Sequence, residues 1–246
     1  MLRVINIGPL ALPGDLVVLL VAFALGAELV GREARRRRLP VAAFNNGGTL
    51  ALLLGILGAR LGYALLHWDA YADAPGGLLA LNAQALSAPI GLAMGLGVWL
   101  GYVGWRGVPP RVALDALAPG IGVLGLGFAL AHAANGSLFG TPSDAPWAVE
   151  LWGASRHPTQ LYAAVWALVL LLTWPRWRDG AAFAWMTGGL AAGWLVVGLW
   201  LAEPETLPGG VRTVQAVAWA LLAACAGWAI SGAASRQPQT DVRGGQ

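Results

Sequence analysis

Residues Phe128 to Ala163 read FALAHAANGSLFGTPSDAPWAVELWGASRHPTQLYA, and this stretch joins two apolar segments through a polar loop. The first segment ends at Asn135-Gly136, a dipeptide that favours a turn. The second begins at Gln160-Leu161-Tyr162. The stretch therefore predicts two helices and a polar crossing between them, where the candidate functional side chains are concentrated.

The composition of the whole chain is that of a membrane protein. Of its 246 residues, 57% are hydrophobic and only 11% are charged, whereas a soluble domain carries about 25% charged residues. Several apolar runs approach the roughly 20 residues that cross a bilayer. Because backbone groups in lipid must be satisfied within their own segment, we expect an all-α polytopic fold.

Seven transmembrane helices are predicted, over residues 15–31, 43–66, 86–104, 112–134, 159–174, 181–201 and 213–232. The connection after the first helix contains Arg32 and the run Arg35 to Arg38. Short loops rich in arginine remain cytoplasmic, which places the N-terminus outside and the C-terminus in the cytoplasm. We expect one membrane domain over residues 1–234 and a polar, disordered cytoplasmic tail over 235–246.

No cofactor, metal or nucleic acid is expected as a partner. The arginines lie beside the apolar runs, where they orient a membrane protein, and do not form a nucleic-acid footprint. The one cysteine, Cys225, lies inside an apolar run and reads as a buried structural thiol. No Cys/His spacing is typical of a metal site.

Arg60 and His132 lie within apolar runs, where an ionisable side chain needs a physical explanation because it is costly in a bilayer. Arg60 either pairs with Asp15 or binds a lipid phosphate, for which a guanidinium group is well suited.

His132 precedes Asn135 by three residues, so the two share one face of a helix. His132 is either a hydrogen-bonded packing residue or part of a site with Arg156, His157 and Gln160, which follow in the polar crossing.

The motifs NGSLFGTPSD and RHPTQLYAA in this crossing resemble those of the prolipoprotein diacylglyceryl transferases. IGPLALP near residue 7, ARLGY at 59–63 and SAPIGLAMG at 87–95 resemble other motifs of that family in the same order. The positions that match are Arg60, Gly62, Tyr63, Asn135, Gly136, Gly140, Pro142, Arg156, His157, Pro158, Gln160 and Tyr162.

This resemblance implies transfer of a diacylglyceryl group from phosphatidylglycerol to the lipobox cysteine of an exported prolipoprotein, at the outer leaflet of a bacterial inner membrane. A thioether forms, glycerol phosphate leaves, and no metal takes part. The implied partners are phosphatidylglycerol and prolipoprotein signal peptides. The resemblance implies substrate binding by Arg60, Tyr63, Asn135, Gly136, Arg156, His157, Gln160 and Tyr162.

The chain departs from the family's motifs at several polar positions. Pro89 stands in place of a His, Ala129 of an Arg, His132 of an Asn and Ser137 of a Glu. His132 is the candidate catalytic residue, as a base. Three readings therefore stay open: a diacylglyceryl transferase, a paralogue that binds phospholipid or lipoprotein signals without transfer, and a structural membrane partner protein.

Overall fold

The computed structural model describes residues 4–7, 10–72, 76–77, 85–177, 181–202, 206, 210 and 212–234. The chain divides into two compact units. Unit 1 comprises Met1–Leu29 and Leu114–Gln246, and unit 2 comprises Val30–Ala113. The predicted tail at 235–246 lies outside the described residues, and the single membrane domain stays a prediction.

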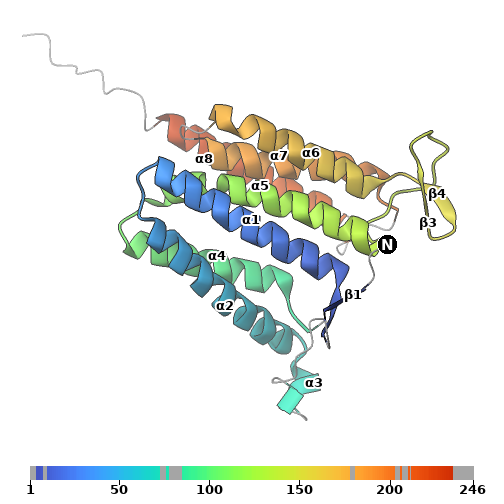
Figure 1. The fold of residues 1–246 in the computed structure, drawn as a ribbon, viewed down its shortest axis with the longest axis horizontal. Helices are drawn as coiled ribbons and strands as arrows, with labels where there is room; N and C mark the ends of the chain where they lie inside the picture. The colour runs from blue at the N-terminus through green and yellow to red at the C-terminus, as the bar shows by residue number, and fades with distance from the viewer. Residues whose placement is uncertain are drawn as a thin grey trace, which may run out of the picture. The chain divides into compact units, whose positions relative to one another are not determined.

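Long helices occupy all of the predicted segments, as Figure 1 shows. They are α1 (Gly14–Arg36), α2 (Val41–Leu66), α4 (Ala88–Trp105), α5 (Pro110–Asn135), α6 (Thr159–Thr173), α7 (Ala182–Val197) and α8 (Thr213–Ala234). Within the described ranges, six helices are long and apolar enough to cross a membrane, whereas α6 has 15 residues. The prediction of a mainly helical, polytopic membrane protein is confirmed.

The outward faces of these helices carry large apolar side chains. Leu92 is 75% exposed, Leu172 72% and Ile230 70%. Such faces suit contact with lipid tails, where an exposed leucine is not in water.

Shorter elements connect the helices. They are α3 (Trp68–Ala72), the 3₁₀ turns η2 (Trp174–Trp177) and η3 (Gly198–Trp200), and the strands β1 (Val4–Ile7), β2 (Leu10–Pro13), β3 (Val149–Leu151) and β4 (Ala154–Arg156). Each pair of strands forms an antiparallel hairpin, β1 with β2 and β3 with β4. The helical pattern in the sequence did not predict either hairpin.

In unit 2, α2 and α4 pack closely through small residues. A Cβ added to Gly55 would lie 3.1 Å from the carbonyl oxygen of Gly91, and one added to Gly91 would lie 2.7 Å from the Cβ of Ala59. Close approach of backbones through small residues is how helices associate in lipid, where the hydrophobic effect does not drive them together.

In unit 1, the core lies where α5, α6, η2 and α7 meet. Its buried side chains are Ala118, Leu170, Trp174, Ala182 and Met186. Helix α7 also packs against α8, so it is central to the unit.

The loop after α5 links three helix ends within unit 1. The Gly140 N–H donates to His157 O (3.2 Å), just before α6, and the Thr141 N–H donates to Trp200 O (2.7 Å), at the end of η3. These bonds hold the end of α5, the start of α6 and the end of α7 at the same end of the unit, beside the β3–β4 hairpin (Figure 1).

Candidate functional site

Helix α5 ends in a glycine cap that shapes the site. Gly136 has φ +74°, and both its own N–H and that of Ser137 donate to the carbonyl of His132, at 2.9 and 3.1 Å. A left-handed residue after a helix is typically glycine, because a side chain there is strained. The tight turn brings Ser137 back toward the last turn of the helix.

Four side chains form a continuous hydrogen-bonded network at this turn, which we call the α5-end network: Asp15, His132, Asn135 and Ser137. His132 Nδ1 lies 2.5 Å from Ser137 Oγ. Ser137 Oγ donates to Asn135 Oδ1 (2.5 Å), and Asn135 Nδ2 donates to Asp15 Oδ2 (3.0 Å). The network joins the first turn of α1 to the last turn of α5.

Two buried side chains at the start of α6 hold the loop below this network. Gln160 is 5% exposed, and its Nε2 donates to Ser137 O (2.6 Å). Thr159 is 1% exposed, and its hydroxyl donates to Leu138 O. Because a buried polar group needs a partner, these bonds fix the backbone of the loop.

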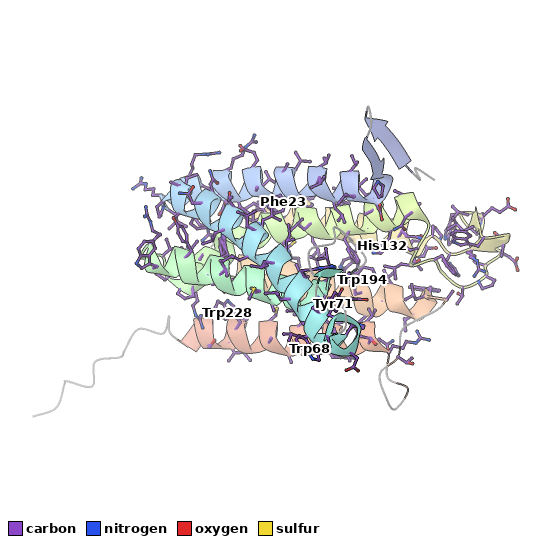
Figure 2. The ribbon with its side chains drawn as sticks, turned by 90° about the horizontal axis from the view of Figure 1, so that it is seen from below. Phe23, Trp68, Tyr71, His132, Trp194 and Trp228 are labelled. Carbon is purple, nitrogen blue, oxygen red and sulfur yellow. The ribbon has the colours of Figure 1, made fainter. Side chains whose placement is uncertain are left out.

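The imidazole ring of His132 is half-buried against aromatic side chains. The Phe128 ring meets it edge-on with centroids 4.3 Å apart, and Trp194 lies 5.9 Å from Phe128. Figure 2 shows His132 on α5 and Trp194 on α7. Among the described residues, none forms a hydrogen bond with His132 Nε2.

A narrow gap beside His132 is too tight in this structure for a water molecule. Its lining residues are Ala129, His132, Leu138, Thr159, Gln160, Trp194 and Val197. A reacting group therefore reaches His132 only after these side chains move or from its exposed edge.

His157 and Tyr162, both predicted to bind substrate, lie beside a wider groove. The Tyr162 hydroxyl accepts a hydrogen bond from Trp147 Nε1 (2.8 Å) and lies 3.1 Å from His157 Nδ1. The groove has a volume of about 400 Å³ and is also lined by Trp166, Gly193, Val196, Val197 and Trp200. Aromatic and apolar walls with a polar end suit an amphipathic ligand.

Arg156 directs its guanidinium group toward the loop backbone. Its Nε donates to Leu151 O (3.2 Å) and its Nη1 to Gly140 O (3.4 Å), while Phe139 packs against its charge at 4.8 Å. A guanidinium group has five N–H donors, so donors remain for a further ligand.

Arg60 and Tyr63 belong to unit 2 and form a separate group. Arg60 donates from Nη1 to Ala85 O (2.9 Å) and from Nη2 to Gly77 O (2.5 Å). Its charge lies 5.8 Å from the Tyr71 ring, which Figure 2 labels, and Tyr63 stacks on His67 with centroids 4.1 Å apart. Arg60 therefore links Gly77 and Ala85 to α2.

Of the residues expected to gather around His132, Asn135 and Gln160 lie at the α5-end network. Arg156 instead contacts the loop backbone, and His157 contacts Tyr162. The network also contains two residues that the sequence did not single out for this site, Ser137 and Asp15. In the sequence, Ser137 stood out only as a replacement for the family's Glu. It directly follows Asn-Gly, and the tight turn of a glycine helix cap brings such a residue back toward the helix. Asp15 lies 120 positions before Asn135, and no local pattern relates the two.

Comparisons with known proteins agree along nearly the whole chain. The sequence model of the family described as "Prolipoprotein diacylglyceryl transferase" matches residues 3–230. A protein of Parasynechococcus marenigrum named phosphatidylglycerol–prolipoprotein diacylglyceryl transferase is 29% identical over 87% of this chain and 87% of its own length. Proteins of the same name from Bordetella avium (32% identical; 85% of this chain and 92% of that protein) and Mycobacteroides abscessus (31%; 70% and 62%) are also similar.

The chain spans less than two thirds of some of these relatives and most of others. The match to the family nevertheless begins near the first residue and includes both the α5-end network and the crossing into α6. The chain belongs to the prolipoprotein diacylglyceryl transferase family.

Proposed function

We propose that this protein transfers a diacylglyceryl group from phosphatidylglycerol to the cysteine of a prolipoprotein, at the outer leaflet of a bacterial inner membrane. Family membership supports the class of reaction. The single observation that carries the proposal for this chain is His132, an imidazole in the polar network with its Nε2 unbonded among the described residues.

In the proposed reaction, His132 Nε2 accepts the proton of the cysteine thiol. The thiolate, which is the nucleophilic form, attacks a glycerol carbon of the lipid. A carbon–sulfur bond forms as the carbon–oxygen bond to phosphate breaks, and the electron pair leaves with glycerol phosphate. General-base catalysis of this kind contributes roughly 10²- to 10⁴-fold in rate.

The predicted substrate-binding residues have different roles under this proposal. Asn135, Gly136 and Gln160 shape the loop that holds the base. His157 and Tyr162 line the groove in which an acyl chain or a signal peptide is accommodated.

Two arginines are proposed to attract the phosphate. Arg156 in unit 1 donates to two backbone carbonyls, and its remaining N–H groups can bind an anion. Arg60 in unit 2 is proposed as a second phosphate-binding residue because a guanidinium group inside an apolar helix carries the charge and the planar donors that suit a phosphate. Tyr63 is proposed to contribute to substrate binding beside Arg60.

We also propose that all seven long helices cross the membrane. Helix α6 continues into η2, and together they extend for about 30 Å, the thickness of the hydrocarbon core. Arginines follow α1, α4 and α6, which supports a cytoplasmic position for these ends and an outer position for the α5-end network.

A second candidate function is a paralogue that binds phospholipid or a lipoprotein signal without transfer. It is favoured by Ala129, an apolar residue lining the gap beside His132 where the family's motif has an Arg. Without that cation, stabilisation of the departing phosphate depends on other residues. The groove beside Tyr162 serves binding in either case.

Complementation separates the two candidates. Cells depleted of their own transferase and expressing this protein are expected to grow and to contain lipoproteins with a thioether-linked diacylglycerol, detected by mass spectrometry. If the protein accumulates in the membrane, co-purifies with phosphatidylglycerol and yields no modified lipoprotein, the transferase is excluded and the binding function is supported.

A further inference from the structure

The direction of each hydrogen bond in the α5-end network can be worked out from donor and acceptor capacity. We infer that Asp15, Asn135 and Ser137 act as positioning residues that hold His132 in the tautomer protonated on Nδ1, so that Nε2 is the nitrogen that accepts a proton from a thiol substrate. This inference rests on the proposed function for the identity of the substrate, and on the contacts below for the tautomer.

The orientation of the Asn135 amide is fixed from two sides. The backbone N–H of Ser137 can only donate, and it lies 2.9 Å from the atom assigned as Oδ1. The carboxylate of Asp15 can only accept, and it lies 3.0 Å from Nδ2. Reversing the amide would set two donors against each other and two acceptors against each other, so Oδ1 faces Ser137.

This orientation of the Asn135 amide determines where the hydroxyl proton of Ser137 points. Asn135 Oδ1 is an acceptor, so the short contact between it and Ser137 Oγ requires that the hydroxyl donate. A serine hydroxyl has one proton. Ser137 Oγ therefore has only its lone pairs to offer His132.

It follows that His132 Nδ1 donates its proton to Ser137 Oγ across their contact. In the neutral ring, Nε2 then carries the lone pair, because one nitrogen is a donor and the other an acceptor. The same direction excludes a Ser–His dyad in which His132 takes the proton of Ser137, so Ser137 is not the nucleophile.

The far end of the network is anchored in α1. Asp15 lies in the first turn of that helix, where its Oδ1 accepts the N–H of Leu16 (2.9 Å). A carboxylate is favoured at a helix N-terminus by the helix dipole. Asp15 thereby holds the Asn135 amide in place, and the Phe128 ring, 4.3 Å from the imidazole, limits the rotation of His132 from the other side.

The inference is tested by ¹⁵N NMR of the full-length protein in lipid nanodiscs with labelled histidine. The sequence has three histidines, so the signals are assigned with single His→Gln variants. We expect His132 to be protonated on Nδ1 at neutral pH in the wild type. In Ser137→Ala, which removes the acceptor, we expect the proton to move to Nε2 in a measurable share of molecules, and Ser137→Thr is expected to restore the wild-type signal.

Ser143→Ala is the matched control, because Ser143 lies on the same loop but its hydroxyl accepts from the N–H of Ala145. A wild-type His132 protonated on Nε2, or an Nδ1–H signal unchanged in Ser137→Ala, would overturn the inference. The NMR readout needs no turnover. Loss of transfer with the expected tautomer therefore counts against the proposed function alone, and transfer by a protein with the opposite tautomer counts against the positioning network alone.

Discussion

Arg60 shows how a charged residue within an apolar helix is used at the scale of one side chain. Arg60 donates to the carbonyls of Gly77 and Ala85, and its charge lies over the ring of Tyr71. Hydrogen bonds from the guanidinium group to backbone carbonyls reduce the free-energy cost of placing its charge in an apolar environment.

Replacing Arg60 with Ala is expected to lower the free energy of unfolding by about 1–3 kcal/mol, because charge-assisted bonds to the two carbonyls are lost. Thermal unfolding in detergent, followed by tryptophan fluorescence, measures this. Arg106→Ala is the control, since Arg106 is exposed and contacts the ring of Trp105. Equal unfolding temperatures for the two variants would show that the carbonyl bonds do not stabilise unit 2.

Phosphatidylglycerol that co-purifies with the Arg60→Ala protein tests its second role. We expect the amount per folded protein to fall if Arg60 also binds the lipid phosphate. An unchanged amount would restrict Arg60 to its bonds with Gly77 and Ala85.

Asp115 illustrates what the sequence could not reveal about a single residue. It is 5% exposed, and its Oδ1 accepts the N–H of Phe183 (3.0 Å), which lies in the first turn of α7. This bond caps the start of α7. The cap lies 68 positions along the chain from Asp115, so only the tertiary structure shows it.

Removal of this cap is expected to destabilise the protein. Asp115→Ala should lower the free energy of unfolding by about 0.5–2 kcal/mol, the usual effect of losing a helix cap. Asp115→Asn keeps an acceptor for the Phe183 N–H and is expected to lie between the wild type and Ala in thermal unfolding. Identical stability of the wild type and Asp115→Ala would contradict the capping role.

At the scale of elements, the pairing of α2 with α4 depends on space for a close backbone approach. Gly91 is buried at this crossing, and a Cβ there would meet the carbonyl oxygen of Gly55 at 2.9 Å. On the same helix, Gly97 has no neighbouring atom within 4 Å of its added Cβ. The two glycines therefore offer a matched pair for substitution.

Gly91→Leu is expected to force α2 and α4 apart and to destabilise unit 2 by about 1–3 kcal/mol, as overpacking does. Gly97→Leu should be neutral or slightly stabilising, because leucine favours a helix more than glycine does. Thermal unfolding of both variants checks this prediction. The opposite order of stability would mean that the crossing is not packed as described.

The long helices could be predicted from the sequence, whereas the short strands could not. Apolar runs of sufficient length predicted where all seven long helices lie, with most bounds within a few residues. The hairpins escaped prediction because strands of three or four residues leave almost no pattern, and β3 with β4 forms in a loop that the sequence marks only as polar. Asn135 and Gln160 were recognised from the family's motifs, and His132 as a polar residue within an apolar run. The contact of Asn135 with Asp15 could not be predicted, because it depends on the packing of α1 against α5.

At the scale of the whole molecule, the family's motifs are carried on a helical membrane scaffold in which the polar network lies at one end of unit 1. The frame of the crossing is retained, and the reacting positions carry Ala129, His132 and Ser137. Under the proposed function, this altered set still performs transfer, with the imidazole of His132 as the base.

The most direct test is transfer measured with the purified protein in vesicles containing phosphatidylglycerol and a lipobox peptide, with the thioether product quantified by mass spectrometry. We predict product with the wild type and a kcat lower by about 10²- to 10⁴-fold in His132→Gln, because the thiol loses its general base. His67→Gln, a histidine of unit 2 at the end of α2, is predicted to retain activity. Product formation at the wild-type rate by His132→Gln, or no product with the wild type, would contradict this account.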